Sequence, residues 1–76
     1  MSELHAMAAQ WEHSAADVRA EAVRVRRGAN LGWSGPAARA YERALVERGR
    51  SLESAAARMS EVARDLRRLA HLEEAA

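Results

Sequence analysis

Cysteine is absent from the 76-residue sequence, which excludes disulfide bonds and thiolate metal sites. No uninterrupted apolar run approaches the ~20 residues of a membrane-spanning helix. Residues 1–5 carry neither a basic region nor an apolar run, so we expect no conventional signal peptide. Twelve basic residues, all of them arginines, nearly balance 11 acidic ones, so net charge favours neither a nucleic-acid nor a membrane-surface partner. A chain of this length predicts a single small domain over residues 1–76.

Proline and glycine are scarce, and they meet in one short stretch, Gly32-Trp33-Ser34-Gly35-Pro36. On both sides of it the sequence has the pattern of a long amphipathic helix, so the stretch predicts the hinge of a two-helix hairpin. Pro36 suits the first turn of the second helix, where a missing N–H costs nothing, and Ser34 or Gly35 can cap that helix. We expect the large side chain of Trp33 to fold back and close the end of the hairpin.

The first helix is predicted from about Glu3 to Arg27, with Ser2 as its N-cap and Gly28 as its C-terminal cap. Large apolar residues recur every seven positions along it, and an alanine follows each of the first three by four positions. These residues are Leu4, Trp11, Val18 and Val25, with Ala8, Ala15 and Ala22. Such a seam, at coiled-coil spacing, lets an antiparallel neighbour approach closely.

The second helix is predicted from Pro36 to about Leu72, with fraying over residues 73–76, where two glutamates oppose the helix dipole. It carries three apolar rows at seven-residue spacing. The first row holds Ala38, Leu45, Leu52, Met59 and Leu66, the second Tyr41, Ala55, Val62 and Leu69 with Arg48 interrupting, and the third Gly49, Ala56, Ala63 and Ala70. This face is wider than one neighbouring helix needs. Gly49 either allows close backbone contact or is simply tolerated, at a cost of about 1 kcal/mol relative to Ala.

The two predicted helices differ in length, so part of the second helix is expected to stay uncovered. Measured from the turn, the far end of the first helix is expected opposite residues 59–62, which leaves Leu66 and Leu69 beyond it. A seam with many alanines also buries little surface. We therefore expect an all-α antiparallel two-helix hairpin that dimerises, with itself or with a related hairpin, into a four-helix bundle. The predicted partner interface comprises Leu45, Gly49, Leu52, Ala56, Met59, Ala63, Leu66 and Leu69.

Groups suited to catalysis are few. His5, His13 and His71 are the candidate bases near neutral pH, and neither His5 nor His13 has a second ligand at metal-binding spacing. His13 and Asp17 can pair at i,i+4, but a helix face without a cleft is not an active site. We therefore expect a non-enzymatic protein with no catalytic residue, no metal and no cofactor.

Most charged residues are typical of solvated helix faces. Acid-then-base pairs at i,i+3 occur at Glu21/Arg24, Glu47/Arg50, Glu61/Arg64 and Asp65/Arg68, and each is worth a few tenths of a kcal/mol. A sharper interpretation makes a patch of Arg64, Arg67 and Arg68, which would bind an anion or dock a partner. Only the local density of arginines supports that interpretation.

The stretch Trp33-Ser34-Gly35, set between two helical segments and followed by Pro36-Ala37-Ala38 and then Tyr41, resembles the WXG family. That family consists of small, early-secreted-antigen-like helical hairpins handled by type VII secretion systems. The resemblance implies a protein that is secreted without a conventional signal peptide, or a cytoplasmic helical partner that escorts a secreted one. Its implied partners are itself, a related hairpin, a secretion ATPase or a toxin.

The export signal of that family is Tyr-x-x-x-Asp/Glu after the second helix, and these residues do not contain it. The only tyrosine, Tyr41, lies near the start of the second helix, and Leu45 occupies the fourth position after it. This difference favours the partner role, because a complex can carry the signal on its other chain. A helical adaptor or toxin-neutralising module unrelated to secretion is the alternative function.

Replacing Trp33 with alanine tests its expected role at the hinge. We expect Trp33 to pack near Val25 and Tyr41, and truncating a buried Trp costs ~3–5 kcal/mol. Trp33→Ala should therefore lower the melting midpoint sharply, as followed by circular dichroism. An unchanged midpoint together with lost partner binding would instead make Trp33 an exposed recognition residue.

Overall fold

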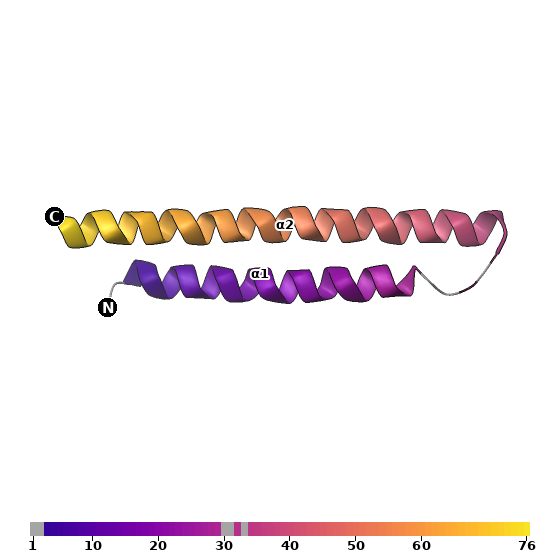
Figure 1. The fold of residues 1–76 in the computed structure, drawn as a ribbon, viewed down its shortest axis with the longest axis horizontal. Coiled ribbons are helices and arrows are strands. Elements are labelled where there is room, and N and C mark those ends of the chain that lie inside the picture. Colours follow the sequence, from indigo (N-terminus) through magenta and orange to yellow (C-terminus); the bar gives the residue numbers. More distant parts are fainter. Residues whose placement is uncertain (1–2, 30–31, 33) are drawn as a thin grey trace.

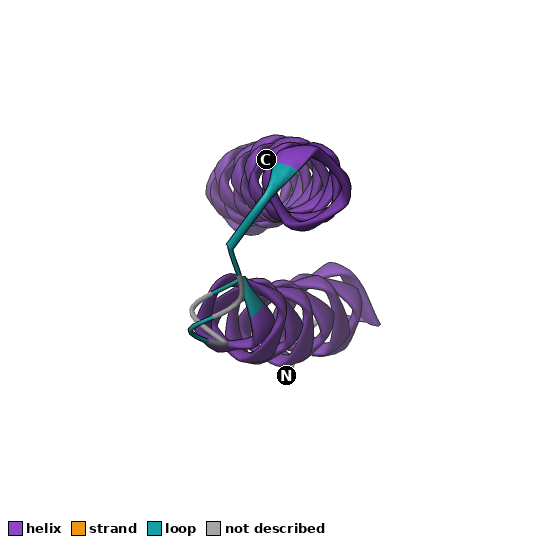
Figure 2. Cartoon of the chain, turned by 90° about the vertical axis from the view of Figure 1, so that its right-hand side faces the viewer, coloured by secondary structure: helices purple, strands orange, loops and turns teal. Residues whose placement is uncertain are grey.

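The chain forms an antiparallel pair of α-helices, α1 (Glu3–Gly28) and α2 (Pro36–Ala75), joined by one connection (Figure 1). This computed structural model describes residues 3–29, 32 and 34–76. Its extents of 62 × 14 × 10 Å make a rod that is one pair of helices thick, as the end-on view shows (Figure 2). The predicted all-α antiparallel hairpin is confirmed.

The start of α2 follows the sequence pattern closely. Pro36 is its first residue, and Gly35 is its N-cap, with a φ of 109° and no capping side-chain hydrogen bond, so Ser34 is not the cap. Among the described residues, positive φ values fall on Gly32 (72°) and Gly35 (109°), where a residue with a Cβ would be strained. Trp33, and with it the expected closure of the hairpin end, lies outside the described residues.

The end of α1 differs from the predicted glycine cap. Gly28 is the last helical residue and has no positive φ, and the Ala29 N–H donates to the Arg26 carbonyl oxygen at 3.1 Å. A Cβ on Gly28 would lie 3.6 Å from Leu45 Cδ1, which is an ordinary contact. The helix therefore closes in a tighter last turn, with no need for a left-handed glycine. Ser2, the predicted N-cap, lies outside the described residues.

The two helices meet along a seam of very small residues. Among the described residues, no side chain larger than alanine is fully buried. The seam consists of Ala8, Ala15 and Ala22 from α1 with Ala38, Gly49, Ala56, Ala63 and Ala70 from α2. The third apolar row of α2 is therefore the one that packs inside the hairpin. Gly49, Ala56 and Ala63 were predicted to face a partner chain, and this prediction is wrong because α1 already covers them.

Gly49 permits the close approach of the two helices. A Cβ at this position would lie 3.3 Å from Arg26 Cγ and 3.8 Å from the Ala22 carbonyl oxygen. The first distance is tighter than most real contacts, and the second brings the backbone of α1 against α2. Of the two interpretations of Gly49, close contact is therefore the correct one.

The relative placement of the helices differs from the predicted one. His5 Nε2 lies 2.7 Å from Glu74 Oε1, so the start of α1 faces the last turns of α2 and not residues 59–62. Leu66 is accordingly half-buried alongside α1, while the first turns of α2 extend beyond α1 at the connection (Figure 1). This overhang places α1 opposite the C-terminal part of α2 (Figure 1).

The predicted fraying of residues 73–76 is also wrong, since α2 continues to Ala75. The Ala76 N–H donates to the Leu72 carbonyl oxygen at 3.2 Å, which closes the last turn. The contact between His5 and Glu74 then ties that turn to α1. These bonds offset the unfavourable position of glutamates at the negative end of the helix dipole.

Enlarging one seam residue tests the close approach of the helices. Ala56→Leu should destabilise the hairpin by about 1–3 kcal/mol, because the added atoms force the backbones apart. Ala57→Leu is the matched control, since Ala57 is exposed one residue further along the same helix. Urea unfolding followed by circular dichroism measures both. Equal stability of the two variants would show that the seam has room for a leucine.

Candidate functional site

The hairpin has two unlike long sides, which follow from the residues next to the seam. In both helices a large apolar residue lies three positions after each of several seam alanines, as Trp11 follows Ala8 and Met59 follows Ala56. A polar residue lies four positions after the same seam alanines, as Glu12 follows Ala8 and Ser60 follows Ala56. In an antiparallel pair of helices, residues that follow a seam residue by the same number of positions lie on the same long side of the pair.

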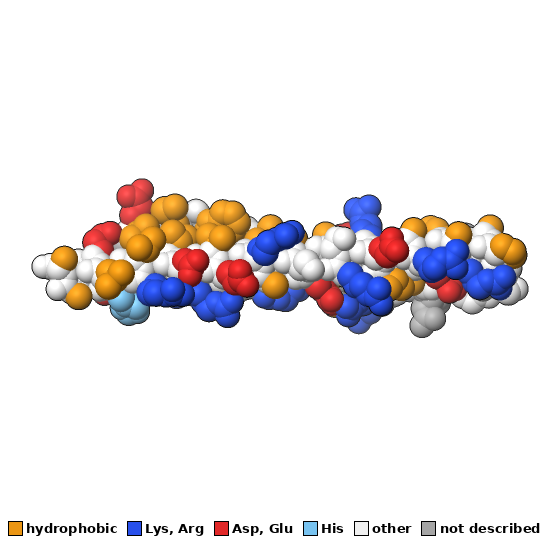
Figure 3. Space-filling view, turned by 90° about the horizontal axis from the view of Figure 1, so that it is seen from above, with side chains coloured by type: hydrophobic (Ala, Val, Ile, Leu, Met, Phe, Trp, Pro, Cys, Tyr) orange, Lys and Arg blue, Asp and Glu red, His pale blue; other side chains and the backbone are white. Residues whose placement is uncertain are grey.

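Each helix therefore adds its large residues to an apolar side and its polar residues to a polar side. Figure 3 shows the result from the outer face of α2. Hydrophobic side chains gather along one long edge of the molecule, and most arginines lie along the other.

The apolar side carries large side chains that the hairpin covers only in part. Leu4, Val18, Val25, Leu45, Leu52, Met59 and Leu66 are half-buried. Trp11 remains 39% exposed and Leu69 52% exposed. Gln10, Trp11, Ser14 and Met59 surround a shallow hollow of about 250 Å³ between the helices on this side. Five of the residues predicted to face a partner lie on this apolar side or at its margin: Leu45, Leu52, Met59, Leu66 and Leu69.

The polar side is bridged by hydrogen bonds and ion pairs between the helices. Glu12 is at its centre: Ser60 Oγ donates to Glu12 Oε1 at 3.0 Å, and Arg67 Nη1 donates to Glu12 Oε2 at 3.4 Å. Arg19 Nη2 in turn donates to Ser60 Oγ at 2.6 Å. Nearer the connection, Arg26 pairs with Glu53. These contacts were not predicted from the sequence, although the polar residues four positions after the seam alanines indicate them.

These contacts lower the pKa of Glu12 below its ordinary value of 4.5. The hydrogen bond from Ser60 is the largest cause, because it stabilises the ionised carboxylate, and the nearby guanidinium of Arg67 acts in the same direction. Partial burial opposes the shift but does not outweigh it. Glu12 therefore stays ionised at neutral pH and holds Ser60 and Arg67 on the polar side.

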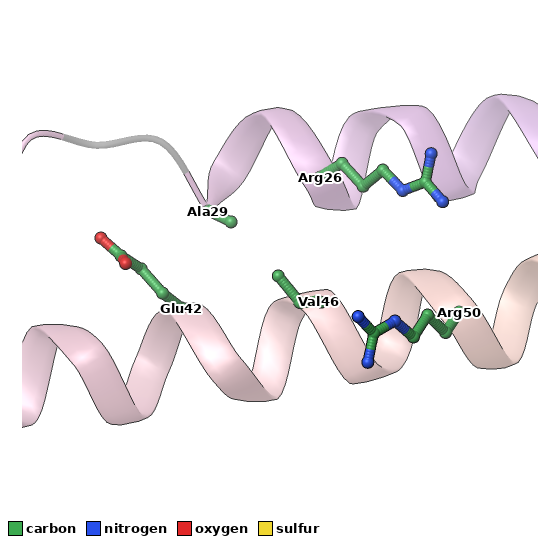
Figure 4. A pocket seen from close by; sticks show the side chains of 5 residues that line it. All are labelled: Arg26, Ala29, Glu42, Val46 and Arg50. Atoms are coloured by element: carbon green, nitrogen blue, oxygen red, sulfur yellow. The ribbon is translucent and has the colours of Figure 1, made fainter.

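A second hollow, of about 450 Å³, lies near the connection on the polar side. Figure 4 shows its lining: Arg26 and Ala29 come from the end of α1 and the residue after it, and Glu42, Val46 and Arg50 come from α2. Val46 points toward α1, and the guanidinium groups approach the hollow from opposite helices (Figure 4). The hollow is open to solvent, and the pairing of Arg26 with Glu53 neutralises one of its two cations.

The histidines lie at positions that do not suggest catalysis. His13 Nε2 is 3.8 Å from Asp17 Oδ2, and both side chains are exposed, so the predicted pair forms on an open helix face. His5 and His71 meet edge to face, with ring centroids 5.8 Å apart, beside Glu74. Within residues 3–29, 32 and 34–76, no group of three or more His, Cys, Asp or Glu residues is arranged to hold a metal ion.

The arginine patch predicted as an alternative is largely neutralised. Arg67 pairs with Glu12, and Arg68 Nη2 lies 2.9 Å from Asp65 Oδ1. Two of its three cations are therefore engaged inside the chain, which favours the interpretation as a solvated helix face. Over the described residues, neither α1 nor α2 carries an apolar stretch that could span a membrane.

Comparisons with family models, with curated proteins and with solved structures give no match to this chain.

The acid dependence of stability tests the role of Glu12. Because its folded-state pKa lies below 4.5, its contribution to stability is present above pH 4.5 and is lost as the pH falls through the lower folded-state value. Glu12→Gln should therefore lower the melting midpoint above pH 4.5, and the difference from the wild type should shrink in more acidic solution.

A second variant assigns that effect to its largest cause. In a Ser60→Ala background, which lacks the hydroxyl donor, Glu12→Gln should change the midpoint less. Thermal melts by circular dichroism over a series of pH values measure all four proteins. A Glu12→Gln effect that is independent of pH would contradict the assignment.

Proposed function

We propose that the chain is a non-enzymatic helical interaction protein, a WXG-like component of a type VII secretion locus. It is either secreted or acts as the helical partner of a secreted protein. Its apolar side binds a second helical hairpin to complete a four-helix bundle. The observation that carries this proposal is the row of large apolar side chains that the hairpin leaves half covered.

The energetic argument starts at the seam. Alanine and glycine bury little surface, so the contact between α1 and α2 stabilises the fold only modestly. The large side chains lie beside the seam, where one hairpin covers them on one flank only. Full burial of such a side chain is worth ~1.5–3 kcal/mol, so a partner that covers several of them supplies much of the missing stability. A contiguous apolar surface of this kind usually marks a protein interface.

The shape of the surface indicates the class of partner. It is straight, runs along both helices, and includes Trp11, Leu52 and Met59 near its middle. A rod of similar length with its own apolar side fits such a surface, in the manner of helix bundles. The resemblance of Trp33-Ser34-Gly35 to the WXG family supports a secretion partner of this type. That partner would carry the export signal, and an ATPase or toxin would act downstream of the complex.

A helical adaptor or toxin-neutralising module is the second candidate. The same apolar side supports it, because a toxin helix and a partner hairpin present similar apolar faces. The identity of the protein bound to this side in the source organism separates the two candidates.

A pair of charge insertions tests the role of the apolar side. Val62 is 36% exposed and precedes the seam residue Ala63 by one position, so it points toward the apolar side. Val23 is 46% exposed and follows the seam residue Ala22 by one position, so it points toward the opposite flank. We expect Val62→Arg to weaken partner binding by roughly a hundredfold, since it buries an unpaired charge, and Val23→Arg to leave binding unchanged.

Tagged wild type and both variants are expressed in the source organism, and bound proteins are identified by mass spectrometry. Static light scattering of the purified proteins gives their oligomeric state. The proposal expects a helical hairpin to be retained by the wild type and Val23→Arg and lost from Val62→Arg. Retention of the same partner by all three proteins would show that the apolar side is not the binding surface.

A further inference from the structure

We propose that the end of the hairpin nearest the connection binds an acidic helical segment of another protein, in which carboxylates surround a large apolar side chain. The site is a groove that Arg39, Arg43, Val46 and Arg50 of α2 form with the end of α1. This basic groove lies on the polar side of the hairpin, away from the surface that the proposed function uses. The inference therefore goes beyond the proposed function and does not depend on it.

The near balance of charge in the whole chain conceals an uneven distribution along the rod. A Cβ at Gly49 would lie within contact distance of Ala22 and Arg26, so this part of α2 lies beside the last turns of α1. Residues 24–28 and 36–50 therefore lie together at the connection end (Figure 1). They contain seven of the 12 arginines but two of the 11 acidic residues. The connection end is thus strongly basic, while the remaining length of the rod has more acidic than basic residues.

Most of these arginines form no ion pair inside the described part of the chain. Arg24 pairs with Glu21, and Arg26 pairs with Glu53. Among the described residues, the ion pair that the spacing of Glu47 and Arg50 allows does not form. The arginines that the described chain leaves unpaired at this end are Arg27, Arg39, Arg43, Arg48 and Arg50. Their side chains are exposed and available to a ligand.

Three of the unpaired arginines lie in one stripe along α2, with a valine between them. At successive steps of four, three and four positions, this stripe consists of Arg39, Arg43, Val46 and Arg50. Such steps keep side chains on one face of a helix. The stripe borders two hollows of about 450 and 430 Å³, which adjoin because Glu42, Val46 and Arg50 line both. Arg26 and Ala29 lie on the α1 side of the larger hollow (Figure 4).

Val46 gives the basic groove an apolar floor. It belongs to a row of α2 with seven-residue spacing, in which Glu53, Ser60 and Arg67 bond to side chains of α1. Val46 lies near the end of α1 at Gly28, and a valine cannot form the hydrogen bonds or ion pairs of the other members. Its side chain therefore stays 38% exposed and lines both hollows.

This combination of groups favours an acidic peptide over a nucleic acid or an anionic lipid surface. Guanidinium groups bind carboxylates through paired hydrogen bonds, and the carboxylates of a ligand supply the counter-charges that these arginines lack inside the chain. Glu42 and Glu47 also line the groove and would repel a continuous array of phosphates, whereas separate carboxylates can be placed to avoid them.

The apolar floor and the spacing of the stripe indicate the form of the peptide. A large apolar side chain of the ligand gains free energy by covering Val46, which a phosphate group would not. A helix repeats the steps of four and three positions that separate the residues of the stripe. A helical segment that lies along α2 therefore presents its carboxylates and its apolar residue to the basic groove together.

A designed peptide tests the basic groove. The probe is a fluorescein-labelled helical peptide of alanine and glutamine that repeats the spacing of the stripe, with glutamate in place of each arginine and leucine in place of the valine. Fluorescence anisotropy with the full chain should show saturable binding below about 100 µM. A peptide with glutamine in place of the glutamates should not bind. A short DNA duplex and vesicles of phosphatidylglycerol with phosphatidylcholine are measured as alternative ligands.

Variants of the stripe locate the bound peptide. Arg43→Glu and Arg50→Glu should each weaken binding about tenfold, because each places a carboxylate against those of the probe. Val46→Ser should weaken it about fivefold, because the leucine of the probe loses its apolar contact. These three side chains are exposed, and circular dichroism verifies that the variants keep their helices.

Arg64→Glu is the matched control for Arg50→Glu. Arg64 follows the seam residue Ala63 by one position, as Arg50 follows Gly49, so the two arginines differ mainly in their place along the rod. Arg64 lies about 20 Å further along α2, at a rise of about 1.5 Å per residue. This exceeds the Debye length of about 10 Å at 0.1 M salt, so in that buffer Arg64→Glu should leave binding within about twofold of the wild type.

The outcomes separate this inference from the proposed function. Binding that is weakened by the three stripe variants and kept by Arg64→Glu supports the inference. It is overturned by absent binding, by equal effects of Arg50→Glu and Arg64→Glu, or by tighter binding of the DNA duplex or the vesicles than of the peptide. Val62→Arg should leave peptide binding unchanged, and a loss in this variant would place the peptide on the apolar side and also overturn the inference.

Discussion

The close approach of α1 and α2 along the alanine and glycine seam is the constraint on which the rest of the hairpin depends. Because a Cβ at Gly49 would already press on Arg26, the seam has no space for larger residues. The large side chains of the described residues therefore lie on the flanks of the seam or on the outer faces of the helices. The sequence sorts these side chains: mainly apolar residues lie three positions after the seam residues, and polar ones lie four positions after them.

The polar side contributes more to the specific alignment of the two helices than to the free energy of unfolding. Its ion pairs are half exposed, and exposed pairs contribute little free energy in water. Glu12, however, accepts hydrogen bonds from both Ser60 and Arg67, and this fixes how far one helix is shifted along the other. The charged groups also disfavour burial of this side against another chain. In the proposed assembly, association is thereby directed to the apolar side.

The proposed assembly follows from how little the isolated hairpin buries. Over the residues that the structure describes, a rod only one pair of helices thick has no interior in which a Trp or Leu side chain is enclosed on all sides. If a second hairpin supplies the missing cover, folding and association are coupled, and the apparent stability depends on protein concentration.

The sequence by itself determined the two helices and their approximate ends. Seven-residue repeats of apolar side chains specify each helix, and Pro36 after Gly35 marks the start of the second, because these are local properties of the backbone. The sequence also identified the rows of Leu45, Leu52, Met59 and Leu66. It did not decide which row faces inward, since three adjacent rows on α2 each satisfy the same periodicity.

Only the tertiary structure decided that the smallest row, with Gly49, packs inside the hairpin, because this choice depends on how close two backbones can come. The same holds for the placement of α1 opposite the last turns of α2. It depends on contacts between residues far apart in the sequence, such as His5 with Glu74, which no local pattern encodes.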